Sequence, residues 1–282
     1  MALATRLRSA SHWSDPRVKP PYGAVSVDRT HPLSQDLVIA CLANEGAGQL
    51  HDVANDLALN PGHGALVMPV WGSSPGGLSH VATTTYFTTR PDFYNSTNGS
   101  MLIILNDKLN VTHFQLIGGI IDALVIDNKI WGVFADHGTI VNNGFDVVHS
   151  GGTVNLGSDT RRAGLHAYGI SLTSGGNAVL YRDGALATTN TWVTPANGNA
   201  NSVPTVRALP AATEIQTVAS VVWNRALSNT ELAWATTEPY AFLRPIIRRR
   251  YFFFTPAAAA AGNIFIQEHI GRGIGRGVLI GR

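Results

Sequence analysis

The sequence QTVASVVWNRALSNTELAWATTEPYAFLRPIIRRRY, residues Gln216–Tyr251, carries the strongest fold signal in the chain. It begins with Gln216–Trp223, an apolar and β-branched run that ends in Trp and is typical of a buried strand. Ser228 and Glu231 then form a Ser-x-x-Glu capping box, which predicts the start of a helix. Two prolines follow, and proline cannot continue a helix. The stretch therefore predicts a last strand, one short helix and an exit from a domain.

Upstream of this stretch, the chain is a series of short strand signals separated by turns. The clearest is a hairpin in which Ala178–Arg182 and Ala185-Leu186 flank Asp183-Gly184, a pair typical of a type I′ turn. Leu165–Leu172 alternates between two faces, as a strand does. The Asn/Thr/Pro-rich segment Thr188–Ala208 is predicted to be a loop. Further strands are predicted at Leu37–Leu42, Ala65–Trp71, Val81–Thr89, Met101–Leu105, Phe114–Ile117, Ala123–Ile126 and Ile130–Ala135.

About ten to twelve short strands and one helix predict an all-β fold. We expect a two-sheet antiparallel jelly-roll or concanavalin-like sandwich with one short C-terminal helix and extended N- and C-terminal arms. The composition agrees, because a chain that is 45% hydrophobic and 13% charged, with 29 Gly and 14 Pro, is too apolar for disorder and suits a turn-rich β protein.

Several classes of protein are excluded by what the sequence lacks. The single Cys41 cannot form an intrachain disulfide and is predicted to be a buried thiol. No run approaches the roughly 18–20 apolar residues that span a bilayer, so no membrane partner is expected. Met1–Trp13 contains two arginines but no apolar region after them, which predicts synthesis in the cytoplasm without a signal peptide.

The segment Val221–Pro245 resembles the closing motif of laminin-G-like (concanavalin A-like) jelly-roll domains of tailed-bacteriophage proteins. In that motif a strand ending in Trp or Tyr is followed by Asn-Arg-Ala-Leu-Ser, a short helix and an aromatic-Arg-Pro exit. The front of the chain also resembles the family, at His31-Pro32-Leu33, Leu37–Leu42, Asn44–Gly48, His51-Asp52 and Asn60–Gly64. The resemblance covers roughly residues 30–254 and implies a virion protein. Some relatives bind calcium or glycans through a Ser-Gly-Asn-Gly loop, where this chain has Val53–Asp56; by analogy Asp52, Asn55 and Asp56 are calcium candidates.

Charge is distributed unevenly along the chain. Residues 1–29 carry five basic and two acidic residues, residues 30–243 carry eight and fifteen, and residues 244–282 carry seven and one. An acidic body between two basic arms predicts arms that dock on acidic surfaces. A protein neighbour and nucleic acid are two such surfaces. The protein is favoured, because the arms lack the dense Lys/Arg and interleaved aromatics of a nucleic-acid groove.

These signals divide the chain into four parts: an extended basic N-terminal arm (1–29), a laminin-G-like β-sandwich (30–254), a Pro/Ala/Gly joint (255–262) and a Gly/Arg-rich C-terminal arm (263–282). Gly at every second position lets the last arm approach another backbone closely. The candidate partner-binding residues are Trp13, Arg244, Arg248, Arg249, Arg250, Arg272, Arg276 and Arg282.

Catalytic motifs are missing from the sequence. Concanavalin-like glycosidases need paired carboxylates, whereas the five glutamates here are isolated. There is also no Gly-x-Ser-x-Gly, His-x-His or His-x-x-x-His. We therefore expect no enzyme, no catalytic residue, and no cofactor other than the calcium considered above. Trp71, Trp131 and Trp223 are predicted core residues, whereas Trp192, in the polar loop, is predicted to be exposed and is the candidate glycan contact.

The leading hypothesis is a non-enzymatic virion structural protein, most simply a capsid decoration (cement) protein on the virion surface. Its arms would bind the major capsid protein or other virion proteins, and a homo-oligomer such as a trimer would fit a symmetric particle. The alternative is a tail or fibre protein whose sandwich binds host-surface glycans. A third reading, a secreted glycan-processing enzyme, is opposed by the missing carboxylate pair and the missing signal peptide. The assignment to a phage particle rests on the family resemblance.

Overall fold

The computed structural model describes residues 13, 18–20, 23–45, 50–61, 70–71, 78–79, 86–88, 98–107, 115–122, 129–135, 144–149, 152–157, 160–192, 202–207, 215–246, 264–268 and 276–280. The chain divides into two units, Met1–Ile246 and Ile247–Arg282. Within the described ranges, the first unit holds two stacked sheets and one α-helix, and the second holds a two-stranded hairpin.

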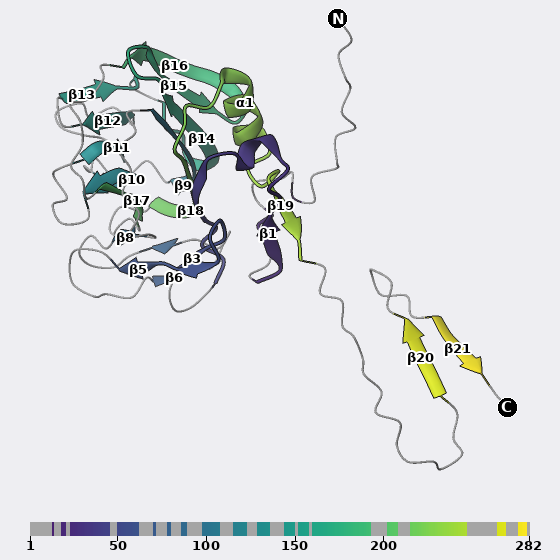
Figure 1. The fold of residues 1–282 in the computed structure, drawn as a ribbon. Helices are drawn as coiled ribbons and strands as arrows, with labels where there is room; N and C mark the ends of the chain where they lie inside the picture. Colours follow the sequence, from purple (N-terminus) through teal and green to yellow (C-terminus); the bar gives the residue numbers. More distant parts are fainter. Residues whose placement is uncertain are drawn as a thin grey trace, which may run out of the picture. The chain divides into compact units, whose positions relative to one another are not determined.

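The larger sheet has the strand order β16-β15-β14-β9-β18-β2-β3-β4 (Figure 1). Strand β7 pairs with β18 and with β6, beside this path. The bounds are β2 (Leu37–Cys41), β3 (His51–Asp52), β4 (Leu57–Ala58), β6 (Val70–Trp71), β7 (Leu78–Ser79), β9 (Gly99–Asp107), β14 (Gly164–Leu172), β15 (Asn177–Arg182), β16 (Ala185–Thr191) and β18 (Ile215–Trp223). The closing strand predicted at Gln216–Trp223 thus lies between β9 and β2, in the middle of the sheet.

The second sheet has the order β13-β12-β11-β10-β17-β8-β5, and all the pairings in both sheets are antiparallel. The bounds are β5 (Asn60–Pro61), β8 (Tyr86–Thr88), β10 (Gln115–Asp122), β11 (Lys129–Ala135), β12 (Phe145–His149), β13 (Gly152–Asn155) and β17 (Ser202–Arg207). The chain passes repeatedly from one sheet to the other. The predicted all-β, two-sheet antiparallel sandwich is confirmed.

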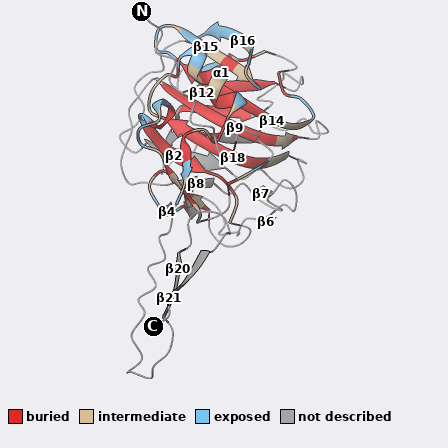
Figure 2. Ribbon diagram, turned by 90° about the vertical axis from the view of Figure 1, so that its right-hand side faces the viewer, coloured by how far each residue is buried: buried red, intermediate tan, exposed pale blue. Residues whose placement is uncertain are grey.

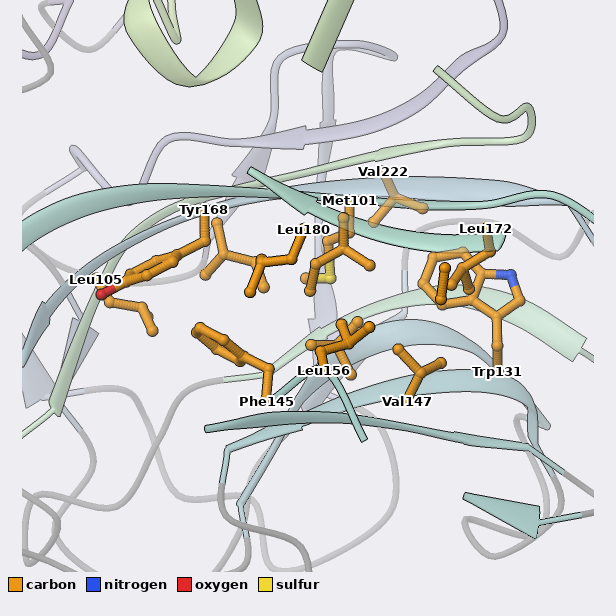
Figure 3. Packing of buried hydrophobic residues seen from close by; sticks show 14 of the residues in the cluster. Met101, Leu105, Trp131, Phe145, Val147, Leu156, Tyr168, Leu172, Leu180 and Val222 are labelled. Carbon is orange, nitrogen blue, oxygen red and sulfur yellow. The ribbon is translucent and has the colours of Figure 1, made fainter. Parts of the chain in front are cut away.

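The inner core fills the space between the sheets. Figure 3 shows Met101, Tyr168 and Leu180 of the larger sheet pointing toward Phe145 and Trp131 of the second sheet. The rings of Phe145 and Tyr168 meet edge to face, with their centroids 4.8 Å apart. Because alternate residues of a strand face opposite sides, Met101, Ile103 and Leu105 on β9 all belong to this layer.

A second apolar layer covers the outer face of the larger sheet, which is therefore buried on both sides (Figure 2). Helix α1 (Asn229–Thr237) lies on this face against β14 and β15. It can approach closely because β14 places small residues there: a Cβ on Gly169 would lie 2.8 Å from Thr236 Cγ2. The predicted capping box is present, with the Ser228 hydroxyl accepting from Glu231 N–H, and the helix ends at Glu238 as expected.

Local predictions fared differently from place to place. Asp183 and Gly184 have φ of 49° and 86°, as the predicted type I′ turn requires, and Cys41 is buried. The predicted loop Thr188–Ala208 is wrong at both ends, because β16 runs to Thr191 and β17 occupies Ser202–Arg207. The strand predicted at Ala123–Ile126 and the side chain of Trp71 lie outside what the structure describes. No helix among the described residues is long and apolar enough to cross a membrane.

Candidate functional site

The front and closing motifs, about 190 residues apart, contact each other directly. Trp223 Nε1 donates to the carbonyl of Leu33, at 2.6 Å, from a fully buried ring. Leu33 belongs to the short 3-10 helix η1 (Pro32–Ser34), in which the side chain of His31 caps the first turn. The His31 and Trp234 rings lie 4.5 Å apart. These contacts fix helix α1 and the chain that leaves it against the start of the sandwich.

Arg225, the arginine of Asn-Arg-Ala-Leu-Ser, is the hub of this contact. Its guanidinium binds both carboxylate oxygens of Glu231, at 3.0 and 2.7 Å. It also donates to the carbonyls of Pro32 and Gln35, each at 3.2 Å. The Arg225 hydrogen bonds lower the pKa of Glu231 to about 2. Sequence reasoning missed this role, although Arg225 stands just ahead of the capping box that it completes.

A ribbon of two strands, β1 (Val25–Val27) and β19 (Leu243–Pro245), joins the start of the sandwich to its last segment. The register is antiparallel and pairs Val25 with Pro245 and Val27 with Leu243. A further hydrogen bond runs from Ile246 N–H to the carbonyl of Ala24, at 2.8 Å. The segment that enters the sandwich and the segment that leaves it therefore lie side by side (Figure 1). We call residues 24–27 and 243–246 the junction ribbon.

The sequence predicted residues 24–27 of the junction ribbon as part of the extended N-terminal arm and residues 243–246 as part of the sandwich. The structure places β1 inside residues 1–29, because Val25 and Val27 are buried in the outer layer while Ser26 between them is not. That alternation is a period-2 strand signal in the sequence. Upstream of it, Lys19 Nζ donates to the carbonyl of Ala43, at 2.8 Å, and Asn44 Nδ2 to that of Pro20, at 2.6 Å. Burial lowers the pKa of Lys19 to about 8.

The predicted partner-binding residues fall into three groups. Arg244 is exposed on the junction ribbon. Trp13 is half-buried and packs against the outer layer of the sandwich. The arginines at 248–250, 272 and 282 lie outside the described residues.

The C-terminal unit contains a hairpin of β20 (Ile264–Glu268) and β21 (Arg276–Ile280). Its register pairs Ile264 with Ile280 and Ile266 with Val278. Arg276, the remaining candidate of the arms, stands opposite Glu268 at the end of the ladder. A two-stranded hairpin is at best marginally stable alone in water.

The calcium candidates do not converge on one point. Asp52 is fully buried, and its Oδ1 accepts from the backbone N–H groups of Ala40 and Ala54, at 2.8 and 2.9 Å, while Oδ2 accepts from the Asn55 amide. The Asp56 side chain is 97% exposed and faces His51. A cation at Asp52 would have to displace these donors. In the described part of the chain no group of three or more His, Cys, Asp or Glu side chains could hold a metal ion.

Trp192, the candidate glycan contact, is 1% exposed, so its predicted exposure is wrong. Strand β16 continues the hairpin ladder up to this residue, and Trp192 N–H donates to the carbonyl of Gly176, at 2.9 Å. The ring enters the inner core and meets His149 edge to face, with centroids 5.0 Å apart. Burial lowers the pKa of His149. Burying the large apolar ring of Trp192 in the core is favourable in free energy, although its neighbours in the sequence are polar.

Other buried polar groups have structural roles in this geometry. Arg161 and Asp107, each 1% exposed, form an ion pair at 3.0 Å at the start of β14. Tyr168 accepts from Arg162 N–H, and burial raises the pKa of its hydroxyl to about 12. Ser171 donates to the carbonyl of Leu227, whose N–H donates to Ser100. These contacts hold loops against strands and are structural. We therefore take the junction ribbon as the candidate site.

Comparison with known proteins adds to the fold. No family model matches the chain, and no curated protein matches it. A sialidase of Trypanosoma rangeli in complex with sialic acid matches 73% of the chain at 15% identity, with a TM-score of 0.50 and 33% of its own length covered. A mutant of that sialidase displaying trans-sialidase activity matches 74% of the chain at 13% identity, with a TM-score of 0.51 and 34% of its own length covered. The binding domain of botulinum neurotoxin serotype G matches 70% of the chain at 14% identity, with a TM-score of 0.47 and 50% of its own length covered.

The chain thus spans between a third and a half of the length of these solved structures. Their shared feature is a β-sandwich, and at these identities the similarity concerns the fold alone. The same sandwich serves many unrelated functions, so function has to be argued from the site.

Proposed function

We propose that the chain is a non-enzymatic structural protein of a tailed-phage particle, a decoration protein held by its two terminal arms. The observation that carries the proposal is the junction ribbon. The segment that enters the sandwich and the segment that leaves it toward the C-terminal arm pair in one antiparallel ribbon, which is buried on one side in the sandwich. The chain therefore enters and leaves the sandwich at one place. Such a body can be displayed on a particle while its arms bind the major capsid protein or other virion proteins.

Three further features support this function. The sandwich carries an excess of acidic residues and the two arms an excess of basic ones. The hairpin β20–β21 belongs to a separate unit and is too small to be stable alone. The front and closing motifs that resemble laminin-G-like phage domains contact each other through Trp223 and Arg225. Binding to an assembled shell would stabilise that shell by mass action.

Deletion of residues 263–282 tests the proposal. We expect the truncated protein to keep the thermal unfolding transition of the sandwich, because these residues lie in the second unit. We also expect it to be lost from purified particles of the phage that encodes it, as measured by mass spectrometry of the virions. The control is a full-length Leu186→Ala variant, which alters an exposed apolar side chain of the body. Normal incorporation of the truncated protein would refute the proposal.

Glycan binding is the competing function, as a tail or fibre protein. One of the similar structures is a sialidase in complex with sialic acid. Trp192, the residue predicted to contact sugar, is buried. A glycan array probed with the full chain separates the two proposals. Reproducible binding of a defined host glycan, at a strength that deletion of residues 263–282 does not change, would favour the tail or fibre protein.

A further inference from the structure

Arg244 occupies a distinctive position on the junction ribbon. Its neighbour Leu243 is 5% exposed and packs into the outer layer, whereas Arg244 points to solvent opposite Ser26. Two residues further along the chain, Ile246 is 41% exposed. A cation and an apolar side chain thus stand together on a backbone that two strands hold in place.

Most arginines whose side chains the structure describes form hydrogen bonds or ion pairs with other residues of the sandwich. Arg29 donates to the carbonyl of Ala54, and Arg182 to that of Thr160. Arg161 and Arg225 are paired with Asp107 and Glu231. Arg244 and Arg162 differ, because both are exposed and neither side chain bonds to a described residue.

Asp28 lies close enough to Arg244 for their charges to interact, but its hydrogen bonds among the described residues go to Thr30. Asp28 Oδ1 accepts from the Thr30 hydroxyl and backbone N–H, at 2.7 and 3.0 Å. These two bonds, with a smaller effect from the charge of Arg244, lower the pKa of Asp28. The Arg244 guanidinium, which carries five N–H donors, is exposed and forms no hydrogen bond to a described residue.

We propose that Arg244 and Ile246 form the central contact of an acidic protein partner on the junction ribbon, an inference that rests on the proposed function. Arg is enriched among residues that dominate binding energy, and its planar guanidinium matches a carboxylate bidentately. The chain continues from Ile246 into Arg248–Arg250, so positive charge follows the contact. A protein partner is favoured over a nucleic acid, because the arms lack the dense Lys/Arg and interleaved aromatic residues of a nucleic-acid groove.

Binding of the full chain to immobilised poly-L-glutamate tests this contact without any phage particle. We compare the wild type with Arg244→Gln and with Arg162→Gln, a matched loss of one exposed and uncommitted arginine elsewhere on the body. The expected result is binding that Arg244→Gln weakens at least about fivefold and Arg162→Gln by less than about twofold. Both variants should keep the wild-type melting temperature, since neither side chain bonds to a described residue.

Three results would overturn the inference: no binding to poly-L-glutamate, equal effects of the two substitutions, or tighter binding to duplex DNA than to poly-L-glutamate at the same salt concentration. The last result would identify a nucleic-acid partner. Because poly-L-glutamate binding needs no virion, this experiment can fail while the arm deletion still abolishes incorporation, and the reverse can also occur. The two proposals are therefore tested separately.

Discussion

Replacing Arg225 by Met should destabilise the sandwich by about 2–3 kcal/mol at neutral pH. The pKa of Glu231 is about 2 in the folded protein, against 4.5 for an ordinary Glu. Each pKa unit corresponds to about 1.4 kcal/mol, so the shift sets an upper limit of about 3.5 kcal/mol. Because the Glu231 side chain is 23% exposed, solvent screening reduces this to about 1–2 kcal/mol. The two bonds to the carbonyls of Pro32 and Gln35 add about 0.5 kcal/mol each.

Urea denaturation of wild type, Arg225→Met, Glu231→Gln and the double variant measures the pair directly. Gln at the third helical position keeps the capping box, so Glu231→Gln removes mainly the ion pair. We expect Glu231→Gln to cost about 1–2 kcal/mol and the double variant to be no less stable than Arg225→Met. Glu238→Gln, at the other end of the same helix, is the control and should change stability by less than about 0.5 kcal/mol.

The pH dependence provides the refuting experiment. The folded-state pKa of Glu231 is lowered, so its stabilisation is complete above about pH 4.5 and is lost as the pH falls toward 2. The difference in unfolding free energy between wild type and Arg225→Met should shrink over that interval to the contribution of the carbonyl bonds. A difference that stays constant from pH 6 to pH 2, or additive effects in the double variant, would refute the assigned role of Arg225.

Two other substitutions test the inner core. A Cβ on Gly99 would lie 2.5 Å from Trp131 Cζ2, so Gly99→Ala should lower the unfolding free energy measured by urea denaturation by about 2–3 kcal/mol. Adding Trp131→Phe to the same chain should relieve part of that cost. Strictly additive effects of the two substitutions would contradict this packing. Trp192→Ala should cost about 3–5 kcal/mol by differential scanning calorimetry, whereas the exposed Leu186→Ala should cost under about 0.5 kcal/mol; an unchanged Trp192→Ala protein would contradict the burial of that ring.

The signals that the sequence shows clearly are local ones. The Ser228–Glu231 capping box and the Asp183-Gly184 turn each depend on residues within four positions of one another, and both are present. The alternation in Leu165–Leu172 also holds, with Tyr168 and Ile170 in the inner core and Ala167 in the outer layer. Such patterns are decided by backbone sterics and by the two-residue period of a strand, which distant residues do not alter.

The features that the sequence did not reveal depend on partners far along the chain. Val25 reads as part of a Pro-rich leader until Pro245 is known to lie beside it. Trp192 reads as a loop residue until the ladder from Gly176 and the ring of His149 are in place. A segment of polar residues forms an exposed loop only when no strand of a sheet extends into that segment. The junction ribbon, the candidate site, could therefore be located only from the structure.

The burial of the larger sheet on both faces explains why the arms begin where they do. A sandwich needs only its inner core, yet Leu102 and Ile104 on β9 face outward and require a cover. Helix α1 covers part of that face, and the junction ribbon covers more of it through Val25, Val27 and Leu243. The segments that carry the arms are thus held by hydrophobic burial. Leu243 is buried in this layer, whereas we propose that Arg244 contacts a partner, so substitutions at these adjacent positions should separate folding from attachment.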